Sequence, residues 1–271
     1  MPGEVKVDAS LEELRRCREE LGTFVYIVSH DLRSPLINLK GFSAELRSAL
    51  EVVQSAVAPL LPQVGEDQQA AVITALEEDI PESLSFIDSS VNRIDRFLNA
   101  ILKLSRWSHR ELRFESLSMD ALVQQALDGL NDEIERQQAT VRLTASLPDV
   151  VADRAAMKEV VGNVLSNAVL YLVSDRPGEV EIAGERRADE TVFTVRDNGR
   201  GIAEEDMHKV FEPFRRAGRQ DVPGQGMGLV YAQALVRRHG GRMTCTSGLG
   251  EGTEVAFSIS NHLGKGDDHV Y

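Results

Sequence analysis

Residues 191–202 read Thr-Val-Phe-Thr-Val-Arg-Asp-Asn-Gly-Arg-Gly-Ile, so an acidic residue and two glycines directly follow a run of strand formers. The β-branched residues of 191–195 favour a β-strand. Gly199 and Gly201 would let the backbone approach a ligand closely. Asp197, at the end of the predicted strand, could accept a hydrogen bond from an exocyclic amine such as that of adenine. An ordinary turn is the alternative, because Asp-Asn-Gly is a common turn sequence.

A second glycine-rich stretch, Gly-Gln-Gly-Met-Gly-Leu at 224–229, precedes a predicted helix over 229–239. A glycine loop that opens a helix offers backbone N–H groups and the positive end of the helix dipole to phosphate. It is not a Rossmann loop, because no βαβ unit with an acidic residue about 20 positions on follows. It is not a Walker loop either, because it lacks Gly-Lys-Ser/Thr.

The stretch Val-Phe-Glu-Pro-Phe-Arg-Arg at 210–216 lies just before this glycine loop. It places two phenylalanines, which could anchor a mobile segment, beside Arg215 and Arg216, which could reach phosphates. A short amphipathic helix with a solvated basic edge is the alternative.

A polar ridge is predicted on the helix over 154–173, where Glu159, Asn163 and Asn167 recur every four residues. This spacing places the three side chains on one helix face. Their oxygen atoms would suit Mg²⁺ and phosphate binding. Buried asparagines with a structural role are the alternative.

The C-terminal part of the chain alternates short strand-like runs with helical stretches, which predicts an α+β domain. The predicted strands cover 141–145, 180–183, 191–195, 241–246 and 254–259, and the predicted helices cover 119–138, 154–173 and 229–239.

The N-terminal part predicts two long helices. Apolar residues recur every three or four positions from 11 to 57, interrupted by little except Pro35, and again over 67–108, a helix with Pro81 near its middle. A loop over 58–67 would join them as an antiparallel hairpin. A hairpin this narrow cannot bury two apolar seams alone, so we expect a homodimer that completes a four-helix bundle.

His30 lies in the stretch Ser-His-Asp-Leu-Arg-Ser-Pro-Leu at 29–36. The heptad pattern assigns Val28 and Leu32 to the core and His30 to the outermost position. Asp31 could accept a proton from one ring nitrogen and so make the other nitrogen a better nucleophile. An exposed histidine without a role is the alternative.

Six stretches, taken in their order, resemble the sensor histidine kinases of two-component systems over about residues 10–260. They are Ser-His-Asp-Leu-Arg-Ser-Pro-Leu, the ridge of Glu159, Asn163 and Asn167, Asp-Asn-Gly-Arg-Gly, Phe-Glu-Pro-Phe, Gly-Gln-Gly-Met-Gly-Leu, and Gly-Glu-Gly-Thr at 250–253. The resemblance implies a dimerisation and histidine-phosphotransfer hairpin at 10–110. It also implies a Bergerat-type α/β-sandwich ATP-binding domain at 112–262, a type shared with gyrase and heat-shock chaperone ATPases.

The resemblance further implies site roles. His30 would be the phospho-acceptor and Asp31 its base or orienting group. Ser34 departs from the family, since it stands where a threonine or asparagine orients water when the kinase also dephosphorylates its partner. ATP and Mg²⁺ would bind in the second domain, with Asn163 as the metal ligand and Asp197 on the adenine amine. The nucleotide-binding residues implied are Glu159, Asn163, Asn167, Asp197, Gly199, Gly201, Phe211, Arg215, Arg216, Gly224, Gly226, Gly228, Leu229 and Thr253.

The function implied is an ATP-dependent autophosphorylating histidine kinase that passes the phosphoryl group from His30 to an aspartate of a response-regulator receiver domain. One departure is Leu170, which stands where the family often has a lysine that contacts phosphate. Another is the hairpin-loop region around 52–75, which is longer than usual. The alternatives are a conformational ATPase of the same fold and a non-catalytic scaffold, the latter favoured by Leu170.

Composition bounds these hypotheses. The 271 residues contain 30 Lys and Arg against 43 Asp and Glu, a net charge of −13. This acidity argues against partners such as nucleic acid or an anionic membrane surface. No apolar run is long enough for a transmembrane helix, and Cys17 and Cys245 have no metal-type spacing. We therefore expect a cytoplasmic protein, whole or as the cytoplasmic part of a longer receptor.

Overall fold

The computed structural model describes residues 2–218, 221–222 and 224–263. It divides into two compact units, and the division falls between His109 and Arg110. Among the described residues, no helix is both long and apolar enough to cross a membrane.

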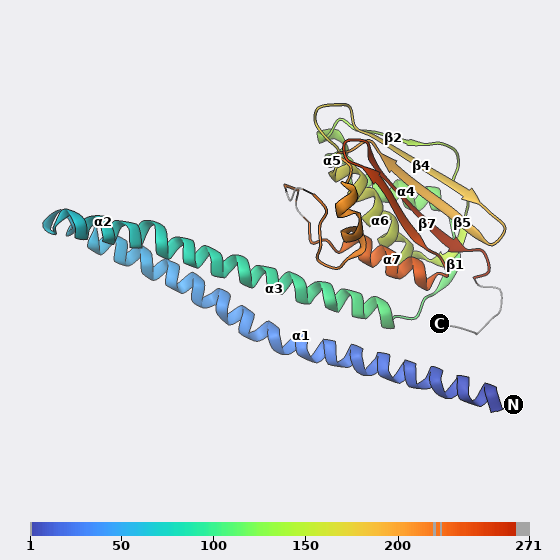
Figure 1. The fold of residues 1–271 in the computed structure, drawn as a ribbon, viewed down its shortest axis with the longest axis horizontal. Helices are drawn as coiled ribbons and strands as arrows, with labels where there is room; N and C mark the ends of the chain where they lie inside the picture. The colour runs from blue at the N-terminus through green and yellow to red at the C-terminus, as the bar shows by residue number, and fades with distance from the viewer. Residues whose placement is uncertain (1, 219–220, 223, 264–271) are drawn as a thin grey trace. The chain divides into compact units, whose positions relative to one another are not determined.

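The first unit is a helical hairpin (Figure 1), in which α1 and α3 run antiparallel. Its elements are α1 (Pro2–Val57), η1 (Leu61–Gln63), α2 (Glu66–Thr74), the π-helical turn η2 (Ala75–Asp79) and α3 (Ile80–His109). The predicted hairpin is confirmed, with one difference. Pro81 stands in the first turn of α3 rather than in mid-helix. Proline has no N–H to donate to the preceding turn, and the irregular π-helical turn directly before α3 accommodates the missing hydrogen bond.

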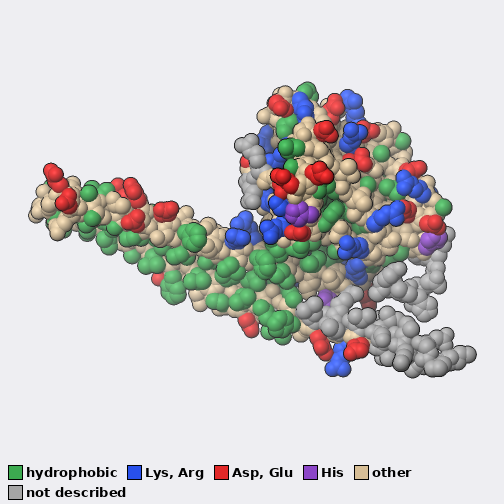
Figure 2. Space-filling view, in the orientation of Figure 1, with side chains coloured by type: hydrophobic (Ala, Val, Ile, Leu, Met, Phe, Trp, Pro, Cys, Tyr) green, Lys and Arg blue, Asp and Glu red, His purple; other side chains and the backbone are tan. Residues whose placement is uncertain are grey.

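The apolar stripe of α1 is wider than α3 alone can cover. Leu36 of α1 packs with Val91 and Leu98 of α3 in the buried core. By contrast Leu32 and Leu46, which the heptad pattern assigned to the core, are 43% and 57% exposed in the single chain. Figure 2 shows hydrophobic side chains gathered along the visible face of this unit. The hairpin therefore presents an uncovered apolar seam of the kind that the sequence predicted.

Polar side chains set the register of the two helices. Ser43 Oγ and Arg47 Nη2 of α1 donate to the two carboxylate oxygens of Asp88 in α3, each at 2.5 Å. The Ser43 hydroxyl and the Arg47 guanidinium lower the pKa of the Asp88 carboxyl, although partial burial opposes them. This network fixes the height of α1, and so of His30, along α3.

The second unit stacks helices on one face of a sheet, as Figure 1 shows. Its elements are β1 (Phe114–Leu117), α4 (Met119–Asp128), α5 (Asn131–Arg136), β2 (Thr140–Leu143), β3 (Val150–Asp153), α6 (Arg154–Leu170), β4 (Glu179–Arg186), β5 (Glu190–Asp197), η3 (Glu204–Phe211), α7 (Gly228–Arg238), β6 (Met243–Gly248) and β7 (Gly252–Ser260). The main sheet has the order β2-β4-β5-β7-β6, in which only β2 and β4 are parallel. The predicted α/β layer is confirmed.

Two details differ from the sequence prediction. The helix expected over 119–138 is two helices, because α4 ends at Gly129 and α5 begins at Asn131. The strands β1 and β3, which form a separate antiparallel pair, were not predicted.

The start of α6 is held by a buried cap. Asp153 Oδ1 accepts from the Ala156 N–H at 2.9 Å, and its Oδ2 accepts from the Arg113 N–H at 2.9 Å. Behind it, the Asp153 N–H donates to His239 Nε2 at 3.1 Å, while His239 Nδ1 lies 2.7 Å from the Leu235 carbonyl. Both helices that border the site, α6 and α7, are therefore tied together at this point.

Candidate functional site

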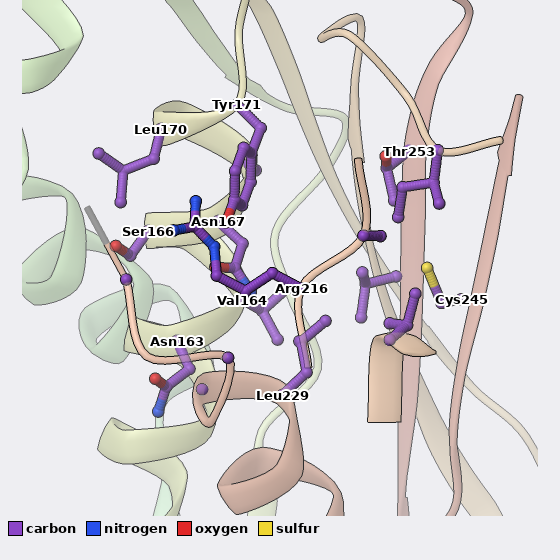
Figure 3. Close-up of a pocket in the computed structure, with 18 of the residues that line it drawn as sticks. Asn163, Val164, Ser166, Asn167, Leu170, Tyr171, Arg216, Leu229, Cys245 and Thr253 are labelled. Atoms are coloured by element: carbon purple, nitrogen blue, oxygen red, sulfur yellow. The ribbon is translucent and has the colours of Figure 1, made fainter. Parts of the chain in front are cut away.

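A cavity of about 360 Å³ lies between α6, the segment after β5, the loop before α7, and strands β5 and β7. In Figure 3, Asn163, Asn167 and Tyr171 project into it from α6 and the residue after it, opposite Thr253 and Cys245 of the sheet. Most of the binding residues expected from the sequence line it: Asn163, Asn167, Asp197, Gly201, Arg215, Arg216, Gly224, Gly226, Gly228, Leu229 and Thr253.

Asp197 stands at the sheet end of the cavity, where β5 terminates opposite Thr253 of β7. Its Oδ1 accepts from the Gly199 N–H at 2.8 Å and from the Thr253 N–H at 3.2 Å. Burial raises the pKa of this carboxyl to about 6, although these hydrogen bonds oppose the rise. Because both bonds go to Oδ1, Oδ2 can accept a donor from a ligand.

The glycines of this region serve backbone packing. Gly201 has φ +65°, and a Cβ at this position would lie 1.8 Å from the Gly248 carbonyl oxygen. A Cβ at Gly199 would lie 2.5 Å from the Tyr171 carbonyl oxygen. Gly199 was expected to let the adenine base approach, but it does not line the cavity. In the structure, its missing side chain allows the backbone to lie close to Tyr171.

A half-buried guanidinium holds the same loop. Arg176 donates through Nη2 to the Asn198, Gly199 and Gly250 carbonyls, at 2.5, 2.8 and 2.8 Å. The side chain thereby joins the loop after β5 to the turn between β6 and β7. The Arg176 side chain therefore helps to hold the sheet end of the cavity in place.

The polar ridge of α6 contains two residues that line the cavity, Asn163 and Asn167, and one that does not, Glu159. Asn163 Nδ2 donates to the Glu159 carbonyl at 2.7 Å and to Glu159 Oε1 at 2.8 Å. Its Oδ1 is therefore directed elsewhere, and a Cβ at Gly228 would lie 2.8 Å from it. Glu159 lies outside the cavity and orients Asn163 rather than contacting a ligand there.

This arrangement fits Mg²⁺ that arrives with a phosphate ligand. Within the described part of the chain, no group of three or more His, Cys, Asp or Glu side chains could hold a metal ion alone. Asn163 Oδ1 offers one oxygen ligand, and Mg²⁺ usually takes its remaining ligands from phosphates and water.

Residues 152–262, which contain the cavity, match the family model described as "Histidine kinase-, DNA gyrase B-, and HSP90-like ATPase". The chain is also a homologue of many sensor histidine kinases.

Two relatives illustrate this homology. The chain is 33% identical over 249 residues to the methanogenesis regulatory histidine kinase FilI of Methanothrix harundinacea, covering 91% of this chain and 25% of that protein. It is 28% identical over 247 residues to the phytochrome-like protein Cph1 of Synechocystis, covering 91% of this chain and 30% of that protein. The chain thus spans between a quarter and about a third of the length of these relatives.

A solved structure shares the fold. The crystal structure of full-length ShkA in complex with AMPPNP matches 82% of this chain and 45% of that chain, with 24% identity and a TM-score of 0.51. This likeness supports the architecture described above, a helical region followed by an α/β domain.

Several cavity residues of the second unit were not predicted from the sequence. The Arg200 guanidinium lies 4.5 Å from the centre of the Tyr171 ring, and both side chains line the cavity. Arg200 stands inside the quoted Asp-Asn-Gly-Arg-Gly stretch, which was interpreted only through its aspartate and glycines. Cys245 also lines the cavity, and its thiol is uncharged at neutral pH because burial raises the pKa of the thiol to about 11.

The loop before α7 brings its arginines to the cavity. Arg216 Nη2 donates to the Val222 carbonyl at 2.6 Å, and Figure 3 shows the side chain reaching across the cavity toward α6. Gly226 has φ +66°, and a Cβ there would lie 2.2 Å from the Arg215 carbonyl oxygen. Phe211, also predicted, ends η3 and does not line the cavity.

The predicted acceptor site lies on α1 of the helical unit. The His30 side chain is 71% exposed, and its Nδ1 is 3.2 Å from Asp31 Oδ1. Ser34, one turn further on, is also exposed. A ring nitrogen of a solvent-facing imidazole is therefore paired with a carboxylate, as the sequence stretch predicted.

Proposed function

We propose that this chain is an ATP-dependent protein histidine kinase that phosphorylates His30 and passes the phosphoryl group to an aspartate of a response-regulator receiver domain. The observation that carries the proposal is the cavity of the second unit, which joins a buried carboxylate, an oriented amide and three arginines. The exposed His30–Asp31 pair on a separate helical unit supplies the acceptor.

Each part of the cavity suits one part of MgATP. Asp197 Oδ2 can accept from the adenine amine, while the backbone of the glycine loop and Arg216 can donate to phosphate oxygens. Asn163 would hold Mg²⁺ together with those oxygens. Bound Mg²⁺ supplies charge neutralisation on the phosphates.

His30 is suited to accept the phosphoryl group. In the tautomer with the proton on Nδ1, the ring donates to Asp31, and the lone pair of Nε2 faces outward. Nε2 attacks the γ-phosphorus in line, an N–P bond forms, and the P–O bond to the β-phosphate oxygen breaks, releasing ADP. The Asp31 carboxylate stabilises the positive charge that develops on the ring.

The second transfer moves the same group onward. A carboxylate oxygen of the receiver domain attacks the phosphorus of phospho-His30, the N–P bond breaks, and the imidazole is regenerated. The uncovered apolar seam of the hairpin supports a homodimer, in which two hairpins would complete a four-helix bundle.

The test is labelling of the full chain with radioactive MgATP. We expect an acid-labile, base-stable phosphate on the wild type and none on His30→Gln. His262→Gln is a matched control, because His262 is also exposed and pairs with an aspartate, Asp189, at 3.2 Å. Label that survives in His30→Gln would refute the assignment.

Two other outcomes would identify the alternatives. Steady phosphate release with no phosphoprotein would favour a conformational ATPase. Failure to bind nucleotide in calorimetry would favour a non-catalytic scaffold.

A further inference from the structure

Two buried donors in the ATPase domain lack an acceptor. Among the described residues, only Arg200 Nη2 and Arg216 Nε are buried side-chain nitrogen or oxygen atoms without a hydrogen-bond partner. Both arginines line the same cavity. A buried donor left unpaired is costly, and more so on a charged group, so this coincidence indicates that the cavity receives a ligand rich in acceptors.

Arg200 is held in a defined position. The backbone N–H of Arg200 donates to the Tyr171 carbonyl at 3.0 Å, and the backbone carbonyl of Arg200 accepts from the Gly250 N–H at 2.7 Å. The guanidinium lies over the Tyr171 ring, and Nη1 donates to Asp221 at 2.5 Å. The side chain is only 20% exposed, so Nη2 is a fixed donor rather than a solvated one.

We propose that Arg200 is a nucleotide-binding residue whose Nη2 donates to a phosphate oxygen of the nucleotide. This inference rests on the proposed function, in that it assumes an adenine nucleotide in the cavity. A phosphate oxygen is the favoured acceptor because charge-assisted hydrogen bonds from a guanidinium to an anion are the strongest available.

The charges around the cavity agree with this role. Position 170, which borders Tyr171, carries an uncharged leucine in the cavity wall, so it contributes no cation there. Arg200 places a cation against Tyr171 from the opposite loop. Asp221 is 54% exposed, so solvent screens its charge and Arg200 keeps much of its attraction for phosphate.

Two other roles for Arg200 would give different results. It could support the cavity only by stacking on Tyr171, or it could only hold the segment before α7 through Asp221. In the first case, removal of the guanidinium would weaken the binding of every adenine compound alike. In the second case, Asp221→Asn would reproduce its effect.

The experiment measures the affinity of the full chain for adenosine, ADP and ATP, by displacement of a fluorescent ATP analogue at constant Mg²⁺. We expect Arg200→Met to weaken ADP and ATP binding at least about tenfold while leaving adenosine binding within twofold of the wild type. Arg196→Met is the matched control, because Arg196 is an exposed arginine on the adjacent strand β5. It should leave all three affinities unchanged.

A rescue variant adds an independent measure. Leu170→Lys in the Arg200→Met background would return a cation to the cavity from the α6 side, and we expect it to recover part of the lost ADP and ATP affinity. Arg200→Lys, which keeps the charge but not the planar fork, should fall between the wild type and Arg200→Met. Circular dichroism and a thermal melt of each variant establish that it is folded.

The outcomes separate this inference from the proposed function. Equal affinities of wild type and Arg200→Met for ADP and ATP would overturn the role of Arg200, as would an equal loss for adenosine. An equal ADP and ATP loss in Asp221→Asn would assign the effect to the Asp221 ion pair instead. A wild type that binds none of the three compounds would refute the nucleotide site itself.

Discussion

Replacement of Asp197 by asparagine should make the ligand-free protein more stable while it removes ATP binding. Asp197 is 7% exposed, and burial raises the pKa of its carboxyl to about 6. At neutral pH the native state therefore holds a buried ionised carboxylate. Asparagine is close in shape, and its side-chain oxygen can still accept from the N–H groups of Gly199 and Thr253.

The magnitude follows from the two pKa values. With a pKa of 3.8 in the unfolded chain and about 6 in the native state, ionisation of Asp197 costs about 3 kcal/mol of stability at pH 7. The native state binds the proton more tightly, so the contribution of Asp197 to stability rises as the pH falls. Between pH 7 and pH 5 this rise amounts to about 1.3 kcal/mol.

Urea unfolding of the full chain, followed by circular dichroism at pH 7 and pH 5, measures this effect as a difference between wild type and Asp197→Asn. We expect the variant to be more stable at pH 7 by about 1–3 kcal/mol, with the advantage shrinking at pH 5. Other carboxylates titrate in both proteins and cancel in the difference. A variant less stable than the wild type at pH 7, or one with the same pH dependence, would contradict the burial cost.

Three further changes test other features. Gly226→Ala should abolish ATP binding in a nucleotide titration, because its Cβ would meet the Arg215 carbonyl, whereas Gly218→Ala, at a similar φ of +67° but in open space, should not. Asp153→Ala should lower the free energy of unfolding by about 2–4 kcal/mol in urea, because it removes the α6 cap and leaves buried donors unpaired; a loss under 1 kcal/mol would contradict this. Leu39→Glu, on the exposed seam, should shift sedimentation equilibrium toward monomer, and an unchanged mass would argue against the proposed dimer interface.

Much of the fold could be predicted because long elements repeat their pattern many times. The hairpin and α6 carry apolar residues over many turns, so their existence follows from periodicity. The strand β1 buries only Leu117 among its four residues, so it carries no apolar alternation. In α1, the buried residues Ser29 and Ser43 each lie one position after a residue that the heptad pattern assigned to the core. This shift depends on how α1 packs in the folded unit, which the sequence period does not record.

The candidate site could be predicted where its chemistry is local in sequence. Asp197 and the glycine loop were found because a strand end and a helix start position them. Glu159 was expected at the nucleotide, yet it orients Asn163 instead, a difference of side-chain direction that spacing cannot resolve. Arg200 and Tyr171 meet across 29 residues of chain, so no local pattern records their contact.

Because of the hydrogen bonds of Arg176, the two ends of the cavity differ in how far they are preorganised for a ligand. At the sheet end, one side chain joins three carbonyls of two loops, so the shape that would surround a base exists before any ligand arrives. At the other end, Arg216 of the segment before α7 has a buried Nε donor without an acceptor. Compounds that fit the sheet end should therefore bind with little entropic penalty, whereas compounds that rely on the arginine end must organise it, and selectivity among inhibitors would be decided there.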